Sequence, residues 1–195
     1  MTTAFCVGNG QSRQNVDLAA LRPYGKIYAC NAVYRSFEPD VLVATDAKIA
    51  AAIQSSGYAK THRFHTRKPV SGSGARPLLK EYRGFSSGPN AIAQACLDGA
   101  ERIYLLGFDF GSVTDRFNNV FADTEFYKSS RDSATYAGNW VTQFERIARD
   151  FSAVRFFRVA GPESVSVPEF AKISNLQEIA LDTFCKQINT SRGLL

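Results

Sequence analysis

The sequence predicts an α/β fold: a single Rossmann-like, doubly wound domain with a mostly parallel sheet, spanning residues 1–195. Short apolar runs alternate with helix-like segments, which is typical of parallel strands covered by helices on both faces. No internal repeat or change of composition divides the chain, and its length suits one hydrophobic core. The first apolar run ends in Gly8-Asn9-Gly10, a turn in which the backbone could approach another group closely.

The N-terminal part of the chain predicts three strands. Residues 4–8 are apolar up to the glycine turn, and residues 26–30 and 41–44 are apolar runs of strand length. A short helix at 18–21, ended by a proline and a glycine, and a helical turn at 33–37 connect them.

The middle of the chain continues the alternation. The alanine-rich residues 47–55 predict a helix, and the alternating residues 61–66 predict a strand. Glycine and serine in 69–77 indicate a mobile loop. Residues 89–99 carry apolar side chains on one helical face, and 102–106 are a buried strand.

The last part begins with a long polar connection, residues 111–138. Residues 139–151 have apolar side chains at helical spacing and predict an amphipathic helix. A strand over 154–159 and a helix around 177–188 complete the expected order.

Composition and charge narrow the function classes. The chain is 45% hydrophobic and 21% charged, as in water-soluble globular proteins, and no apolar run is long enough for a membrane span. Because the start also lacks a signal-peptide pattern, we expect a cytoplasmic protein. The four cysteines form no C-x-x-C pair and predict reduced thiols, with no metal site.

A net charge of +5 favours anionic partners. The basic residues and histidines concentrate in one region, namely Lys60, His62, Arg63, His65, Arg67, Lys68, Arg76, Lys80 and Arg83. This region is either a solvated loop or a nucleic-acid contact. Aromatic residues at the spacing of an RNA-binding strand motif are absent, so a small phosphorylated ligand ranks before nucleic acid.

Ligands bind outside the carboxyl ends of the strands in doubly wound sheets. The residues that leave the predicted strands there, or start the next helix, are small hydrogen-bonding groups with two carboxylates. They are Gly8, Asn9, Gly10, Ser12, Asn31, Asp46, Ser86, Ser87, Gly88, Asp109 and Phe110. This set suits a base, a ribose and a phosphate better than a metal centre.

Several of these residues could have a structural role and not a role in ligand binding. Asn9 and Asn31 would then satisfy turn backbone, and Ser86 and Ser87 would cap the following helix. Of the two carboxylates that end apolar strands, one could be a helix N-cap, or both could hold a ribose or Mg²⁺. A capped helix start remains an anion site, so capping and ligand binding are compatible.

Taken together, these motifs resemble the small bacterial sialyltransferases of glycosyltransferase family 42. The resemblance covers residues 4–160 in element order and rests on Val7-Gly8-Asn9-Gly10-Gln11-Ser12, Tyr28-Ala29-Cys30-Asn31, Ser86-Ser87-Gly88 and Ile103-Tyr104-Leu105-Leu106-Gly107-Phe108-Asp109-Phe110. With Pro39-Asp40 and Thr45-Asp46 added, the same order also resembles the 6-hydroxymethylpterin pyrophosphokinase-like family.

The sialyltransferase resemblance implies a site for a cytidine nucleotide. Its contacts to base, ribose or phosphate would come from Asn9, Gly10, Ser12, Asn31, Ser87 and Gly88, and Phe110 would line the pocket.

The chain departs from the family pattern at the catalytic positions. The family has a histidine before its long helix, whereas this chain has no histidine after His65. The family's phosphate-binding tyrosines correspond to Gly111 and Phe117 here. Tyr127 or Tyr136 could replace them, and the candidate catalytic residues are Asp109, Arg116, Arg131 and Tyr136.

Three function classes follow from these observations. The first is a nucleotide or nucleotide-sugar binding transferase, either a glycosyltransferase with a cytidine-type donor or a Mg²⁺-dependent diphosphate transferase. The second is a non-catalytic nucleotide-binding or assembly protein, with the aromatic-rich residues 117–140 as an interface and a homo-oligomer as one outcome. The third is a nucleic-acid-associated protein.

Overall fold

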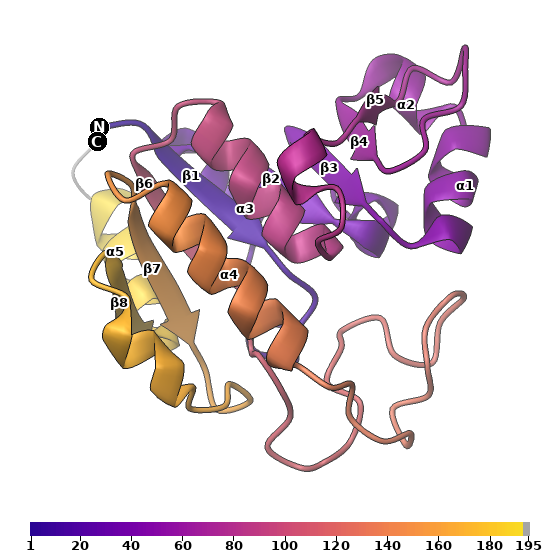
Figure 1. Cartoon of the computed structure of the whole chain (residues 1–195). Helices are drawn as coiled ribbons and strands as arrows, with labels where there is room; N and C mark the ends of the chain where they lie inside the picture. The colour runs from indigo at the N-terminus through magenta and orange to yellow at the C-terminus, as the bar shows by residue number, and fades with distance from the viewer. Residues whose placement is uncertain (193–195) are drawn as a thin grey trace.

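The computed structural model describes residues 1–192 and contains one eight-stranded parallel sheet in the order β5-β4-β3-β2-β1-β6-β7-β8 (Figure 1). Every neighbouring pair of strands is parallel, which confirms the predicted fold class. The strands are β1 (Thr3–Val7), β2 (Lys26–Cys30), β3 (Val41–Ala44), β4 (Phe64–Thr66), β5 (Arg76–Pro77), β6 (Arg102–Leu106), β7 (Arg155–Ala160) and β8 (Leu176–Ala180).

Helices cover both faces of the sheet. The α-helices are α1 (Ala47–Ser55), α2 (Tyr58–Thr61), α3 (Ser87–Leu97), α4 (Gly138–Asp150) and α5 (Leu181–Arg192). Short 3-10 helices join them, namely η1 (Gln11–Arg13), η2 (Ala19–Tyr24), η3 (Asn31–Arg35), η4 (Lys80–Tyr82) and η5 (Pro168–Lys172). In Figure 1, α3 and α4 lie side by side in front of the sheet, and α5 lies behind it.

Each buried strand divides its side chains between two hydrophobic cores, because successive residues point to opposite faces. In β1, Ala4 and Cys6 join the core under α3 and α4, whereas Phe5 and Val7 join the core under α1 and α5. Phe144 of α4 packs edge-on against Phe156 of β7 at 5.4 Å between ring centroids. Both faces of the central strands are therefore closed to water.

The order of the strands reverses between β1 and β6. The chain builds β2 to β5 on one side of β1 and then crosses back to place β6 on its other side. Val7 at the end of β1 pairs with both Ala29 and Leu106, so three strand ends lie in register. The loops that leave β1 and β6 turn to opposite sides, and such a reversal is where doubly wound sheets open a crevice.

Several predicted elements differ from the structure. Residues 58–61 form α2, so the strand predicted over 61–66 is shorter, and the loop predicted over 69–77 ends in the edge strand β5. The short helix predicted at 18–21 folds as the 3-10 helix η2, which runs on to Tyr24 and contains Pro23. A proline removes one backbone donor, and this favours a short helix over a longer α-helix.

The predicted helix at 177–188 is also corrected. Leu176–Ala180 form the strand β8, and the helix α5 begins only at Leu181. Leu176 and Ile179 are partly buried on the sheet while Gln177 and Glu178 are exposed, so strand pairing with β7 decides this segment. Polar residues on such an edge strand disfavour pairing with another chain.

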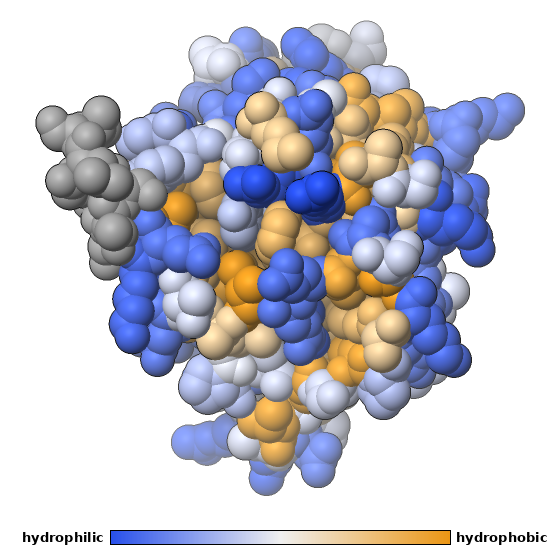
Figure 2. All heavy atoms as spheres, turned by 90° about the vertical axis from the view of Figure 1, so that its left-hand side faces the viewer, coloured by the Kyte–Doolittle hydropathy of each residue, from blue (hydrophilic) through white to orange (hydrophobic). Residues whose placement is uncertain are grey.

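The surface near β8 shows no continuous apolar face. Figure 2 looks onto the side of the molecule where β8, α5 and the N-terminus lie, and hydrophilic side chains separate its apolar patches. Within residues 1–192, no helix combines the length and apolarity needed to cross a bilayer. The four cysteines are free thiols, and three of them are buried.

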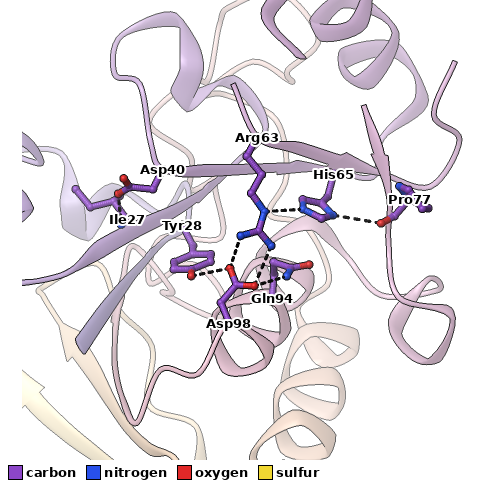
Figure 3. Close-up of polar contacts among 8 residues, drawn as sticks. All are labelled: Ile27, Tyr28, Asp40, Arg63, His65, Pro77, Gln94 and Asp98. Carbon is purple, nitrogen blue, oxygen red and sulfur yellow. Dashed lines mark hydrogen bonds and ion pairs between the residues drawn. The ribbon is translucent and has the colours of Figure 1, made fainter. Parts of the chain in front are cut away.

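A polar cluster fastens the C-terminal end of α3 to the sheet (Figure 3). The Asp98 carboxylate accepts hydrogen bonds from Tyr28 Oη at 2.8 Å and from both terminal nitrogens of Arg63, at 2.6 and 2.8 Å. Gln94 Nε2 donates a further bond at 2.9 Å. Burial opposes ionisation of Asp98, but these donors outweigh it and lower the pKa of the carboxyl group.

His65 completes this cluster as a neutral side chain. Its Nε2 accepts a hydrogen bond from Arg63 Nε at 3.1 Å, so its Nδ1 carries the proton and donates to the Pro77 carbonyl at 3.2 Å. Burial, followed by the nearby charges of Arg63 and Arg76, lowers the pKa of His65 against the raising effect of the Pro77 carbonyl. A second proton on the ring would face the Arg63 guanidinium.

We therefore predict that the free energy of unfolding falls as the pH drops below about 6.5, where an unfolded histidine binds a proton that native His65 resists. The slope should approach 1.4 kcal/mol per pH unit between the unfolded and native pKa values of His65. Urea denaturation between pH 7.5 and 5 would measure it. The slope should disappear in His65→Gln and persist in His62→Gln, and an equal slope in the His65 variant would contradict the assignment.

Candidate functional site

A cavity of about 360 Å³ lies at the carboxyl edge of the sheet, over the reversal between β1 and β6. Its walls come from the ends of β1, β2, β3 and β6, the start of α3 and the first turns of α4. The lining residues are Gly8, Asn9, Gly10, Cys30, Asn31, Thr45, Asp46, Ser86, Ser87, Gly88, Pro89, Ile92, Gly107, Phe108, Asp109, Phe110, Gly111, Asn118, Asn119, Trp140 and Phe144. All the predicted ligand-binding residues except Ser12 line it.

The glycine turn after β1 packs tightly on the end of β6. A Cβ atom at Gly8 would lie 2.5 Å from the Gly107 carbonyl oxygen, and one at Gly10 would collide with the Asp109 carboxylate. Most amides of this turn are already paired, and among them Gly10 donates to the Gly107 carbonyl at 2.9 Å and Ser12 to Asp109 Oδ2 at 3.1 Å. The turn therefore shapes the cavity, and these amides do not face a phosphate.

The Asp109 carboxylate joins three loops. Its Oδ2 accepts bonds from the Ser12 amide and from Asn118 Nδ2, each at 3.1 Å, and its Oδ1 accepts a bond from Ser164 Oγ at 2.8 Å. Asp109 is only 4% exposed. Both oxygens are committed to structure, so Asp109 holds the site together and has little capacity to act on a substrate.

Arg158 of β7 supports the loop that leaves β6, in which Asp109 lies. Its guanidinium is buried, pairs with Glu178 and donates to the Phe108 and Asp109 carbonyls at 3.0 and 3.1 Å. It also lies over the Phe110 ring, 5.3 Å from the centroid. These contacts fix the backbone that leaves β6.

Two residues other than glycine in this cavity have a left-handed backbone. Asn31 has φ +55° directly after β2, and Phe110 has φ +53° after β6. Asparagine tolerates this conformation, whereas a bulky aromatic residue adopts it only under constraint. Rings of Phe108, Phe144 and Phe170 around Phe110 supply that constraint.

A hydrogen-bonded triad connects β2, β3 and α3. Ser87 Oγ donates to Asn31 Oδ1 at 2.8 Å, accepts a bond from the Thr45 amide at 2.9 Å and lies 3.0 Å from Thr45 Oγ1. Ser86 is the N-cap residue of α3, as predicted, but its side chain makes no capping bond.

The start of α3 opens directly onto the cavity. Ser86, Ser87, Gly88 and Pro89 all line it, and α3 is an eleven-residue helix with no acidic residue in its first turn. A helix start carries unpaired amides and a partial positive charge. This is therefore the place in the cavity best suited to an anion.

A second cavity of about 310 Å³ adjoins the first. The two share Asn31, Asp46, Gly111, Asn118, Asn119 and Trp140. Its remaining walls include Phe117, Phe126, Tyr127 and Lys128 from the long connection between β6 and α4. The two cavities form one cleft with two compartments.

That long connection folds back onto the strand ends through Asn118 and Tyr127. Asn118 Oδ1 accepts a bond from the Gln11 amide at 2.8 Å, and its Nδ2 contacts Asp109 Oδ2 and the carbonyls of Gly111 and Glu163. The Tyr127 hydroxyl accepts bonds from the Ala32 amide and Asn9 Nδ2, each at 3.3 Å. Burial raises the pKa of Tyr127 well above its usual value and keeps it a neutral phenol.

Two buried polar atoms next to the glycine turn lack a partner in the described part of the chain. They are Asn9 Oδ1 and Arg13 Nη2. Asn9 lines the cavity, and exchanging its amide oxygen and nitrogen would leave the other amide atom unpaired. An unpaired buried amide is costly, and a ligand hydroxyl or amine could pair with it.

Three of the four predicted catalytic residues lie outside the cleft. Arg116 and Arg131 are exposed, and the Arg116 guanidinium donates to the Arg131 carbonyl at 2.6 Å. Tyr136 is 78% exposed. Neither cavity is lined by any of these three side chains, so the geometry assigns them no catalytic contact.

The cleft residues that the sequence did not single out come mainly from the connection and from α4. Asn118, Asn119 and Lys128 lack a motif or period that could have identified them, and the helical spacing of Trp140 within 139–151 indicated a core position rather than a cleft wall. Asp46, by contrast, has both predicted features, because it lines the cleft and caps α1. Among residues 1–192, no three histidine, cysteine or acidic side chains come together as a metal-binding group.

Two solved structures of the sialyltransferase CstII from Campylobacter jejuni share this fold. The first, in complex with the substrate analogue CMP-3FNeuAc, is 13% identical over 90% of this chain and 86% of that chain, with a TM-score of 0.58. The second, in complex with cytidine-5'-monophosphate, is 14% identical over 90% of this chain and 85% of that chain, with a TM-score of 0.51.

At this identity the likeness shows the fold alone. No protein-family model matches the chain, and no curated protein matches it in sequence. Neither structural match supports the resemblance to the pyrophosphokinase-like family.

The Asn118 contacts predict that Asn118→Ala lowers the free energy of unfolding by about 2–3 kcal/mol, because buried donors and acceptors lose their partners. Asn119→Ala is the matched control. It removes only one local bond, from the Phe121 amide, and should cost about 1 kcal/mol or less. Urea denaturation of both variants measures the difference. Equal losses would show that Asn118 does not organise the loops.

Proposed function

We propose that this protein is a nucleotide-sugar-dependent transferase that binds a cytidine-type nucleotide in the 360 Å³ cavity. The observation that carries the proposal is the convergence of segments distant in sequence on one cavity at the strand reversal. Many of their side chains at the strand ends are small hydrogen-bonding groups. The CstII structures, which hold a cytidine nucleotide or a CMP-sugar analogue, support the choice of nucleotide.

The start of α3 would take the phosphate. The Ser87 and Gly88 backbone lies at the positive end of the helix, and most amides of the glycine turn are already paired within the protein. Gly88 also packs closely on the Phe108 ring, because a Cβ atom there would lie only 3.0 Å from it. The Asn31 and Asn9 amides, on neighbouring strand ends, would then bond the sugar or the base.

The two compartments of the cleft support transfer over simple storage of a nucleotide. A donor in the first cavity leaves the second, with Phe117, Phe126 and Trp140 in its walls, for an acceptor. Aromatic walls with a few polar groups are typical of sites for small organic molecules.

One observation favours a second candidate, a nucleotide-binding protein without transferase activity. Arg116, Arg131 and Tyr136, the residues predicted to replace the catalytic groups of the family, do not line the cleft. The two candidates share the nucleotide site and differ only in turnover of a donor.

We predict that CMP at a hundred times its dissociation constant raises the free energy of unfolding by about 2.7 kcal/mol. Asn31→Asp should weaken CMP binding at least tenfold, about 1.4 kcal/mol, because it brings a negative charge into the cavity next to the phosphate. The fluorescence of Trp140, the single tryptophan and a residue of both cavity walls, would report binding.

The matched control is Asn15→Asp, which adds the same charge at an exposed position outside the cleft and should bind CMP like the parent. Asn31→Asp keeps the oxygen that accepts the Ser87 bond, and urea denaturation checks that it is folded. Absence of CMP binding by the parent at millimolar concentration, or equal binding by Asn31→Asp, would refute the proposed site.

A further inference from the structure

We propose that Asp46 is the catalytic base that takes the proton from the acceptor hydroxyl. This inference rests on the proposed transferase function and deepens it, because it assigns the step for which the chain lacks the expected histidine. The geometry that points to Asp46 is its position where the two compartments of the cleft meet.

Transfer requires the donor carbon and the acceptor oxygen to meet, and only the shared wall of the two cavities borders both. The residues of that wall are Asn31, Asp46, Gly111, Asn118, Asn119 and Trp140. Asp46 is the one member of this set with a carboxylate, whose oxygens can accept a proton from a hydroxyl group. A base elsewhere in the cleft would touch one compartment alone.

The other ionisable residues that line the cleft are unsuited to this step. Both oxygens of Asp109 are held by Ser12, Asn118 and Ser164. Burial raises the pKa of the Cys30 thiol to about 12, and burial likewise keeps Tyr127 protonated.

Lys128 is the remaining ionisable residue of the lining. Its ammonium group has three donors and no lone pair with which to accept a proton. It lies 5.8 Å from the centre of the Phe117 ring, in the second compartment.

The start of α1 holds the Asp46 carboxylate in place. Asp46 Oδ1 accepts bonds from the Lys48 amide at 3.0 Å and the Ile49 amide at 3.4 Å, as an N-cap residue does. No hydrogen bond to Oδ2 occurs in the described part of the chain, and the residue is exposed. One oxygen therefore anchors the group, and the other is directed by that anchor and open to a substrate.

The proposed step balances without a further reactant. The acceptor O–H bond breaks and its proton passes to Asp46 Oδ2. The acceptor oxygen forms a bond to the anomeric carbon of the donor, and the bond from that carbon to the phosphate oxygen breaks. The electron pair of that bond leaves with the nucleoside monophosphate, and Asp46 then releases its proton to solvent.

The test is Asp46→Asn, assayed with CMP-activated sugars as donors and water or simple saccharides as acceptors, with released CMP as the product measured. Asparagine caps a helix as well as aspartate does, so α1 should remain stable and CMP binding should stay within twofold of the parent. We expect kcat to fall at least a hundredfold. We expect kcat/KM of the parent to fall toward acid pH and this fall to be absent in the variant's residual activity, whereas a purely structural role would leave the fall in place.

Asp17→Asn is the matched control. Asp17 also caps a helix start, with Oδ1 bonded to the Ala19 and Ala20 amides at 3.0 and 3.3 Å, and it lies outside both cavities. It loses the same charge and should keep the activity and the pH profile of the parent.

Three results would overturn the inference, and they differ in whether they also exclude transferase activity or nucleotide binding. Turnover by Asp46→Asn within threefold of the parent would exclude Asp46 and leave the transferase function intact. CMP binding by the parent without release of CMP from any donor would leave a nucleotide-binding protein. A parent that binds no CMP would remove the proposed function as well.

Discussion

The cleft depends on the hydrogen bonds that the Asp109 carboxylate accepts. Three segments that leave different strands, through Ser12, Asn118 and Ser164, all donate to this one group at the end of β6. A buried carboxylate needs several donors to offset the loss of water, so the three loops can reach their lowest free energy only together. The site is therefore assembled as one unit by a carboxylate whose oxygens are already bonded within the protein.

The position of that unit follows from the topology of the sheet. Strand order reverses between β1 and β6, and their loops must separate there. The chain that leaves β6 has a left-handed backbone at Phe110, and Arg158 of β7 supports that backbone. Structural groups thus surround the cleft, and the open oxygen of Asp46 and the start of α3 are the parts of the lining best suited to a ligand.

The sequence predicts the sheet and its carboxyl edge well, because apolar runs of strand length are a strong local signal. That signal located Gly8, Asn31 and Ser87 on one edge, and the structure brings them to one cavity. It could not locate Asn118, which lies in a connection without periodicity and acts through contacts distant in sequence. Nor could this local signal show that residues 176–180 form the strand β8 and not the start of a helix, because that choice depends on long-range pairing with β7.

A crystal structure of the protein with CMP tests the proposed nucleotide site most directly. We predict the nucleotide in the 360 Å³ cavity, with its phosphate at the Ser87 and Gly88 amides and its ribose or base on Asn31. Asp46 should then lie beyond the phosphate, at the boundary with the second compartment. Ordered CMP at another surface, with this cavity filled only by water, would contradict the central claim.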